Sequence, residues 1–229
     1  MSNITVLLAD DHNIVRQGLR ALLLAEGDLT IVAEAATGRE AVQLAARHRP
    51  EVVVMDLAMP LLNGCEATRQ ILKLVPTAKV VVLSTYGDDS HLHQAIAAGA
   101  AAYLLKQTAA GDLVKAIREV KRGNAFFSPA IANRLREQTC QPGATLKPPK
   151  PTGLELSSRE VEVLQLIAEG FANKQIAAEL GLSVKTVEKH RQAVMNKLNI
   201  HDIPGLVRHA VSQGIIEMNL AGVPPSEGV

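Results

Sequence analysis

Residues 52–64 read VVVMDLAMPLLNG, and the prediction of the fold of the first half of the chain starts from this stretch. Its first four residues, Val52–Met55, are apolar, and an aspartate, Asp56, follows them at once. A short apolar run rich in β-branched side chains predicts a strand that is buried on both faces. Four further runs of this character flank it: Ile4–Ala9, Thr30–Glu34, Val80–Leu83 and Ala102–Leu105.

Helical patterns lie between these runs, with apolar residues at the spacing of one helix face. The clearest are Val15, Leu19, Leu22 and Leu23 in one segment and Leu113, Ile117 and Val120 in another. Five strands that alternate with helices predict a doubly wound, five-stranded parallel α/β fold with right-handed connections.

Length and composition set the class of protein. A chain of 229 residues with 47% hydrophobic residues fits two small globular domains and excludes a disordered protein. The net charge of +1 gives the whole chain no general preference for nucleic acid. Two cysteines, Cys65 and Cys140, exclude a disulfide scaffold. With no signal peptide and no membrane-length apolar run, we expect a cytoplasmic protein without membrane contact.

A proline-rich stretch divides the chain. Residues 138–153 read QTCQPGATLKPPKPTG, and prolines at this density predict an extended linker. We therefore expect an α/β domain over 1–128, a linker over 129–153, a helical domain over 154–216 and a tail over 217–229.

The second half of the chain has no strand pattern and predicts four helices. A capping box, Ser157 to Glu160, opens the first helix, and Gly181 closes a short helix over 173–180. A third helix begins at Ser183 and a fourth covers 203–213. We expect the third helix to face inward with Val184, Val187, Val194 and Leu198.

Acidic residues stand at the ends of two predicted strands, Asp10 and Asp11 after the first and Asp56 after the third. Each one alone is typical of a helix cap or a turn. In a parallel sheet, however, such residues meet at one edge, where three carboxylates repel one another unless a cation such as Mg²⁺ binds. Ser84 and Lys106 follow two more strands and add a hydroxyl and a cation to the same edge.

Together these residues resemble the receiver domain of a two-component response regulator, over residues 4–124. The resemblance rests on Asp10-Asp11, on Asp56 in VVVMDLAMPLLNG, on Ser84 in VVVLSTYG and on Lys106 in GAAAYLLK. It implies a flavodoxin-like receiver that is regulatory rather than an enzyme with a separate substrate.

The roles implied for single residues follow from the same resemblance. Asp56 is the expected phosphoryl acceptor, and Asp10, Asp11, Asp56 and the backbone carbonyl of Ala58 are the expected Mg²⁺ ligands. Ser84 and Lys106 are expected to contact the phosphoryl group, after which Tyr103 would turn inward.

The string LSSREVEVLQLIAEGFANKQIAAELGLSVKTVEKHRQAVMNKLNI resembles the LuxR/GerE helix-turn-helix module, over residues 154–213. A receiver joined to this module defines the NarL/FixJ subfamily. The stretch 173–201 has five lysines and arginines against two glutamates, a local net charge of +3 that suits a DNA-docking face.

The third helix would lie in the major groove, with Lys189 and Gln192 near base edges and Glu188 able to accept a hydrogen bond from cytosine. The expected phosphate contacts are Lys174, Lys185, Thr186, Arg191 and Lys197.

The resemblance implies a phosphorylation-gated transcriptional regulator. Its expected partners are a sensor histidine kinase, double-stranded promoter DNA and a second copy of the chain on activation. One alternative is a DNA-binding protein that works without phosphorylation and keeps the receiver only for dimerisation. Another is an aspartyl-phosphate phosphohydrolase, which Ala58 disfavours because such enzymes carry a second acid at this position.

Overall fold

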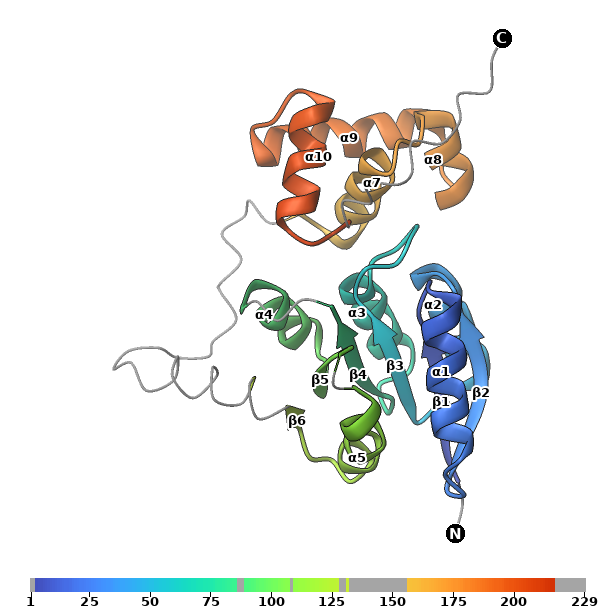
Figure 1. The fold of residues 1–229 in the computed structure, drawn as a ribbon. Helices are drawn as coiled ribbons and strands as arrows, with labels where there is room; N and C mark the ends of the chain where they lie inside the picture. Colours follow the sequence, from blue (N-terminus) through green and yellow to red (C-terminus); the bar gives the residue numbers. More distant parts are fainter. Residues whose placement is uncertain (1–2, 86–88, 108, 128–130, 132–155, 217–229) are drawn as a thin grey trace.

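The structure is a computed structural model that describes residues 3–85, 89–107, 109–127, 131 and 156–216. These residues form an α/β unit in the first half of the chain and a helical unit in the second (Figure 1). The predicted linker, 129–153, and the predicted tail, 217–229, fall outside the described residues apart from Ile131. Among the described residues, no helix is long and apolar enough to cross a membrane.

The α/β unit is a doubly wound parallel sheet, as the sequence predicts, with the strand order β2-β1-β3-β4-β5-β6. The strands are β1 (Ile4–Ala9), β2 (Leu29–Ala35), β3 (Val52–Asp56), β4 (Lys79–Ser84), β5 (Ala102–Leu105) and β6 (Phe126–Phe127). The helices are α1 (Asn13–Leu24), α2 (Gly38–His48), α3 (Gly64–Leu74), α4 (Asp89–Ala98) and α5 (Ala109–Lys121).

The sheet differs from the prediction at one edge, where β6 makes a sixth strand. Phe126 and Phe127 pair in parallel with Ala102 and Tyr103 of β5. Two residues are too few to produce a readable strand pattern in the sequence, so this addition has no signal there.

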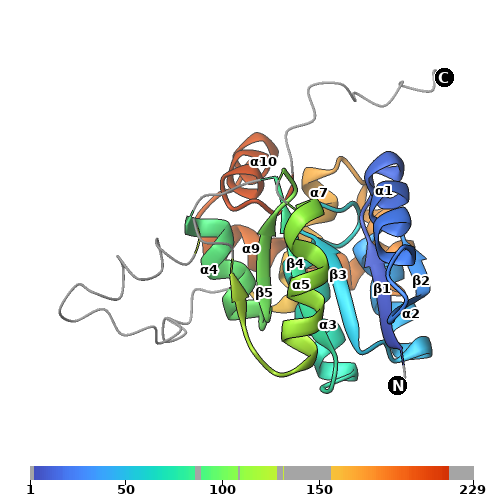
Figure 2. The same cartoon turned by 60° about the horizontal axis from the view of Figure 1, so that its bottom comes forward.

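Two apolar layers hold the sheet. Side chains of α1 and α5, such as Leu23 and Ile117, cover one face of the sheet. They form one apolar core with side chains of the sheet itself, such as Val6 and Leu8 of β1. In Figure 2 these two helices lie in front of the sheet. The other face carries α2, α3 and α4, with Ile71 as a buried residue of α3. Because β3 and β4 are covered on both faces, nearly all of their side chains are buried.

The helical unit contains four helices over residues 156–216, as predicted: α7 (Ser158–Ala168), α8 (Asn173–Leu180), α9 (Val184–Leu198) and α10 (Ile203–Ser212). The capping box at Ser157 and Glu160 is present, and Gly181 ends α8 with a left-handed φ of 65°. Ser183 caps α9 by accepting a hydrogen bond from the Thr186 amide. Val187 and Val194 are buried as expected, whereas Val184 is 40% exposed, so its predicted inward position is wrong. It is the first residue of α9 and lies beyond the apolar core.

Candidate functional site

An acidic site forms at the carboxyl ends of β1 and β3. Asp10 directly follows β1 and is 1% exposed, and Asp56 is the last residue of β3 and is 3% exposed. Because β1 and β3 are neighbouring parallel strands, their ends meet. One ligand atom from each of Asp10, Asp11, His12 and Asp56 lies within 4.8 Å of the others. The structure thus brings together the three acids that the sequence placed at one edge.

Lys106 completes the acidic site from the end of β5. Its Nζ lies 2.7 Å from Asp56 Oδ2 and 2.9 Å from Asp10 Oδ2. Its backbone amide donates to the carbonyl oxygen of Ser84 at 2.8 Å, which places β4 and β5 side by side at the same edge. Ser84 itself is buried.

The electrostatics of the acidic site are those of crowded carboxylates with one cation. Burial raises the pKa of Asp56 to about 7, opposed by the Lys106 ammonium and reinforced by Asp10. Burial alone would lower the pKa of Lys106, but the Asp56 carboxylate raises it above its usual value. Three acids against one lysine leave excess negative charge, and their carboxylate oxygens are the donor type that Mg²⁺ prefers. The residues present therefore fit a divalent cation.

His12 also belongs to the acidic site, a role that was not predicted from the sequence. Its Nδ1 lies 2.8 Å from Asp11 Oδ1, and its backbone amide donates to Asp10 Oδ1 at 2.8 Å. The imidazole therefore lies nearer to Asp11, the more exposed acid, than to Asp10, whose Oδ1 is 3.4 Å from the same nitrogen. Its position directly after Asp10-Asp11 is the only sequence signal that could have placed it here.

Two more residues named from the sequence lie in the core beside this edge. Tyr103 is fully buried among the residues that pack under α2, α3 and α4, so its ring already lies inward. Cys65 packs partly buried against the same core, and burial raises the pKa of its thiol to about 11. The thiol is therefore protonated at neutral pH and is a poor candidate for redox chemistry.

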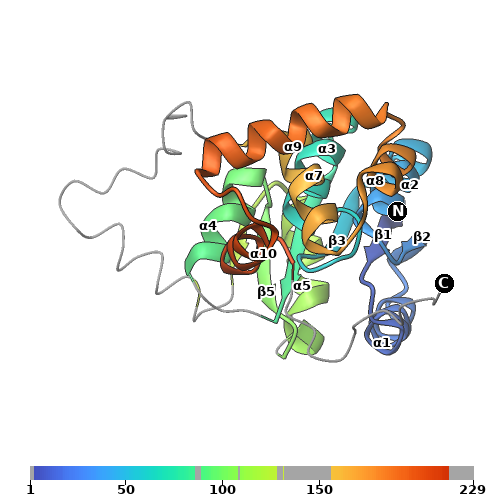
Figure 3. The same ribbon diagram turned by 90° about the horizontal axis from the view of Figure 1, so that it is seen from above.

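The outward side of α9 is open to solvent. Lys185, Glu188, Lys189 and Gln192 are exposed, and we call these four residues the recognition face. Seen from above, α9 runs along one edge of the helical unit (Figure 3). Lys174 of α8 is exposed as well.

The other three expected DNA contacts already have partners within the helical unit. Lys197 Nζ donates to Glu160 Oε2 at 2.7 Å, and Arg191 donates to Asn173 Oδ1 at 3.0 Å. The Thr186 hydroxyl lies 2.8 Å from Ser183 Oγ. The contacts of Lys197 and Arg191 connect α9 to α7 and α8. These two residues therefore help to hold the helices together, besides any contact with a phosphate.

The loop between β3 and α3, residues 57–63, contacts the helical unit (Figure 1). Gln165 of α7 donates to Met59 O at 2.9 Å and accepts from Asn63 N at 2.7 Å. Glu169, which follows α7, accepts from Leu61 N at 3.1 Å. This interface has no signal in the sequence, because nothing in the pattern of α7 distinguishes Gln165 and Glu169 from ordinary helix positions.

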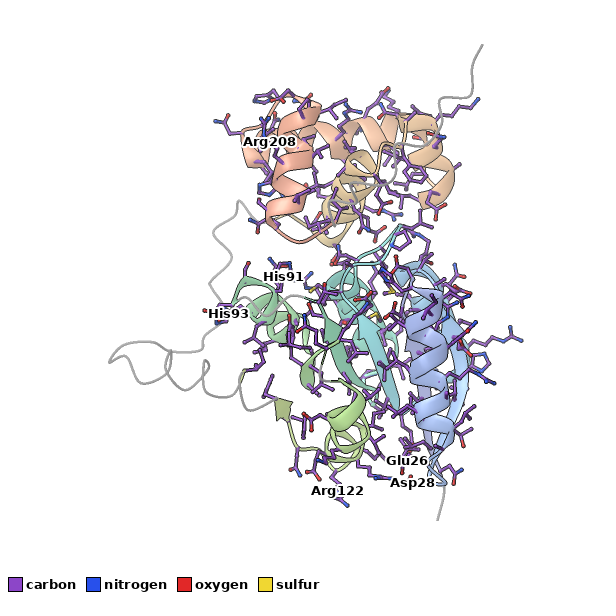
Figure 4. The ribbon with its side chains drawn as sticks, in the orientation of Figure 1. Glu26, Asp28, His91, His93, Arg122 and Arg208 are labelled. Carbon is purple, nitrogen blue, oxygen red and sulfur yellow. The ribbon has the colours of Figure 1, made fainter. Side chains whose placement is uncertain are left out.

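Charged groups extend the interface between the two units. Arg39 of α2 lies 3.0 Å from Glu179 of α8 and 3.6 Å from Glu162 of α7. The far end of the α/β unit carries a separate, exposed charge cluster, in which Arg118 contacts Glu26 and Asp28. Figure 4 shows Glu26, Asp28 and Arg122 at that end, away from the helical unit.

Comparison with known proteins gives two family matches that divide the chain between them. Residues 6–118 match the response regulator receiver domain, and residues 154–210 match the bacterial regulatory proteins of the luxR family. The oxygen regulatory protein NreC of Staphylococcus carnosus is 37% identical over 217 residues, covering 93% of this chain and 99% of that protein. The response regulator protein VraR of Staphylococcus aureus is 35% identical, with the same coverage.

Solved structures agree with this assignment. The RcsB response regulator of Salmonella typhimurium has 27% identity and a TM-score of 0.55, covering 93% of this chain and all of that one. An RcsB–DNA complex gives 28% identity and a TM-score of 0.56, covering 92% of this chain and 99% of that one. The chain belongs to the DNA-binding response regulators that join a receiver domain to a LuxR-type helix-turn-helix domain.

Proposed function

We propose that Asp56 accepts a phosphoryl group from a sensor histidine kinase, and that this event controls binding of the helical unit to promoter DNA. The assignment of Asp56 as the phosphoryl acceptor is supported by the contact of Lys106 with both Asp56 and Asp10, at the edge of the sheet where Asp11 also lies. The α/β unit then corresponds to the proposed domain 1–128 and the helical unit to 154–216.

The chemistry follows from the residue types. A carboxylate oxygen of Asp56 forms a bond to phosphorus while the bond from phosphorus to the donor breaks, which leaves an acyl phosphate. Lys106 and Ser84 are positioned at the same edge to interact with the transferred oxygens. Asp10, Asp11, Asp56 and the carbonyl of Ala58 would hold Mg²⁺, which neutralises phosphoryl charge when bound.

The helical unit supplies the DNA-binding surface. The recognition face carries Lys189 and Gln192, whose side chains suit base edges, and Lys185, which suits a phosphate. Lys174 extends the basic surface onto α8. Glu188 would accept a hydrogen bond from cytosine, while Thr186, Arg191 and Lys197 would reach phosphates only by leaving or sharing their present partners.

The exposure of the recognition face favours control of DNA binding through dimerisation over control through the release of a covered recognition face. The four side chains of this face are exposed while the helical unit contacts the β3–α3 loop, so the α/β unit does not cover them. Two copies joined on one DNA would gain avidity without any new contact in each copy. We therefore propose that phosphorylation promotes a homodimer that binds two half-sites.

A phosphorylation assay on the full chain tests the first half of this proposal. Incubation with Mg²⁺ and a small phosphodonor should add one phosphoryl group to the wild type, detected by mass spectrometry, and none to Asp56→Asn. Asp89→Asn, at an exposed aspartate in the first turn of α4, is the matched control and should label normally. Labelling of Asp56→Asn at the wild-type level would contradict the assignment.

A DNA-binding assay tests the second half. A target obtained by in vitro selection should bind the phosphorylated full chain more tightly than the unphosphorylated one, and as a dimer. Equal affinity of the two forms would favour the alternative in which the receiver serves only for constitutive dimerisation.

A further inference from the structure

The β3–α3 loop connects the acidic site directly to the helical unit. It begins with Leu57, the residue after Asp56, and it contains Ala58, whose carbonyl is a proposed Mg²⁺ ligand. It ends at Asn63, whose side chain caps α3 by accepting a hydrogen bond from Glu66 N. The loop therefore connects the acceptor, Asp56, to the first turn of α3 through a single short segment.

A single glutamine of the helical unit binds the loop at two positions, Met59 and Asn63. The Gln165 amide oxygen accepts from Asn63 N at 2.7 Å and from Asn63 Nδ2 at 3.2 Å. Its amide nitrogen donates to Met59 O at 2.9 Å and to Glu169 Oε1 at 2.8 Å. The side chain is fully buried, and these contacts use both its acceptor and its donors. Met59 is the residue directly after Ala58.

Leu61, within the same loop, contacts the helical unit as well. The side chain of Leu61 packs against the apolar core of that unit, and its amide donates to Glu169. Leu61 has a φ of 66°, a left-handed conformation that is unfavourable for a residue with a side chain. Surrounding contacts must hold such a conformation, and here they come from the helical unit.

The α/β unit also contacts the loop closely, through its backbone. A Cβ at Gly64 would overlap the carbonyl oxygen of Asp56, and a Cβ at Gly38 would overlap that of Leu62. The Gly64 amide donates to Leu57 O at 2.8 Å. With close backbone contacts from the α/β unit and hydrogen bonds from Gln165, the loop has little freedom while the two units are docked.

We propose that Gln165 is a positioning residue for the metal site: by holding Met59 and Asn63, the helical unit preorganises the segment that supplies the Ala58 carbonyl. The inference rests on the proposed function, because it takes the acidic site to bind Mg²⁺. Preorganised ligands bind with a smaller loss of conformational entropy. Since coupling between two equilibria is reciprocal, Mg²⁺ binding also strengthens the docking of the helical unit.

Titration of Mg²⁺ into the full chain, followed by calorimetry, tests the inference. Gln165→Leu keeps the size of the side chain and removes its hydrogen bonds, and it should raise the Mg²⁺ dissociation constant on the order of 10-fold, the lower end of the effect of outer-shell partners. Gln43→Leu, at an exposed glutamine of α2, is the matched control and should leave the constant unchanged.

Hydrogen exchange of the amides in residues 57–63 gives a readout that does not depend on phosphorylation. Mg²⁺ should slow this exchange in the wild type and in Gln43→Leu, and should slow it much less in Gln165→Leu. Leu61→Ala provides a second test that leaves the core of α7 intact, and it should also raise the dissociation constant, by a smaller factor.

The outcomes separate this inference from the proposed function. If the wild type binds Mg²⁺ and the affinity is unchanged in both Gln165→Leu and Leu61→Ala, the positioning role is wrong and the metal site stands. If the wild type does not bind Mg²⁺, the metal assignment fails and this inference fails with it.

Discussion

The β3–α3 loop, which follows the proposed phosphoryl acceptor, and α9, which carries the recognition face, are the two functional segments of this molecule. They differ in how closely the rest of the chain packs around them. The loop is held by close backbone contacts within the α/β unit and by hydrogen bonds from Gln165, whereas α9 buries one side in the core and exposes the recognition face to solvent. Phosphoryl chemistry needs fixed geometry, and groove binding needs access. Substitutions in the loop should therefore affect folding and chemistry together, and substitutions on the recognition face should affect DNA binding alone.

Gly64→Ala should have the largest effect, because the new Cβ would overlap the backbone of Asp56 and Leu57, which cannot move aside as a flexible side chain would. We expect a loss of about 3 kcal/mol in the free energy of unfolding, measured by chemical denaturation. Gly181→Ala is the control in the helical unit. Its φ is 65°, but the Cβ would meet no neighbour within 4 Å, so about 1 kcal/mol is expected. Equal losses would show that the loop is less tightly packed than this contrast requires.

Val187→Ala and Val184→Ala compare the two sides of α9. Val187 is fully buried and Val184 is 40% exposed. Loss of the buried methyl groups should cost about 2 kcal/mol of unfolding free energy, and loss of the exposed ones close to nothing. A large loss from Val184→Ala would mean that the amino end of α9 is covered in solution.

Much of this architecture could be predicted from the sequence because it depends on local pattern. The five long strands are apolar runs, and the polar residues Asp10, Asp56 and Lys106 stand where parallel strands end. The sixth strand was not predicted, because its two residues, Phe126 and Phe127, are too few to form a recognisable strand pattern. Val184 was misplaced because helical spacing assigns a face but does not say how far the core extends along it.

The contact between the two units could not be predicted for a different reason. Gln165 is fully buried although glutamine is mostly an exposed residue, and its partners in the β3–α3 loop, Asn63 and Met59, lie 102 and 106 positions away in the chain. Arg39 likewise resembles an ordinary surface arginine in sequence but contacts Glu162 and Glu179. Such pairings depend on tertiary docking, which leaves no local periodicity.

Lys189→Ala and Lys185→Ala should separate base recognition from phosphate contact on the recognition face. We expect Lys189→Ala to cost about 1–3 kcal/mol on the selected target and to relax sequence preference. Lys185→Ala should weaken binding to all sequences alike and reduce the salt dependence of binding. Fluorescence anisotropy with target and scrambled DNA at several salt concentrations measures both effects. Unfolding free energies should not change in either variant. A loss of stability would contradict the expectation that substitutions on the recognition face affect DNA binding alone.

Glu169→Gln should have the smallest effect, seen only as a change in pH dependence. Burial raises the pKa of Glu169, a shift opposed by its hydrogen bonds with Gln165 and Leu61 N and by Arg39, and reinforced by Glu179. A carboxyl whose pKa is raised by folding stabilises the folded chain fully below its unfolded value, near 4.5, and this contribution is lost as the pH rises through the folded value.

Because the glutamine amide does not titrate, Glu169→Gln should lose less stability than the wild type between pH 5 and pH 8, and its carbonyl can still accept the Leu61 amide. Denaturation curves at the two pH values measure the difference, with Glu188→Gln on the recognition face as the exposed control that should follow the wild type. A flatter profile in Glu169→Gln alone would show that Glu169 is buried at the β3–α3 loop while the recognition face stays in solvent. Identical profiles in all three proteins would mean that Glu169 remains solvated, and that the β3–α3 loop is held less closely than its contacts with α7 indicate.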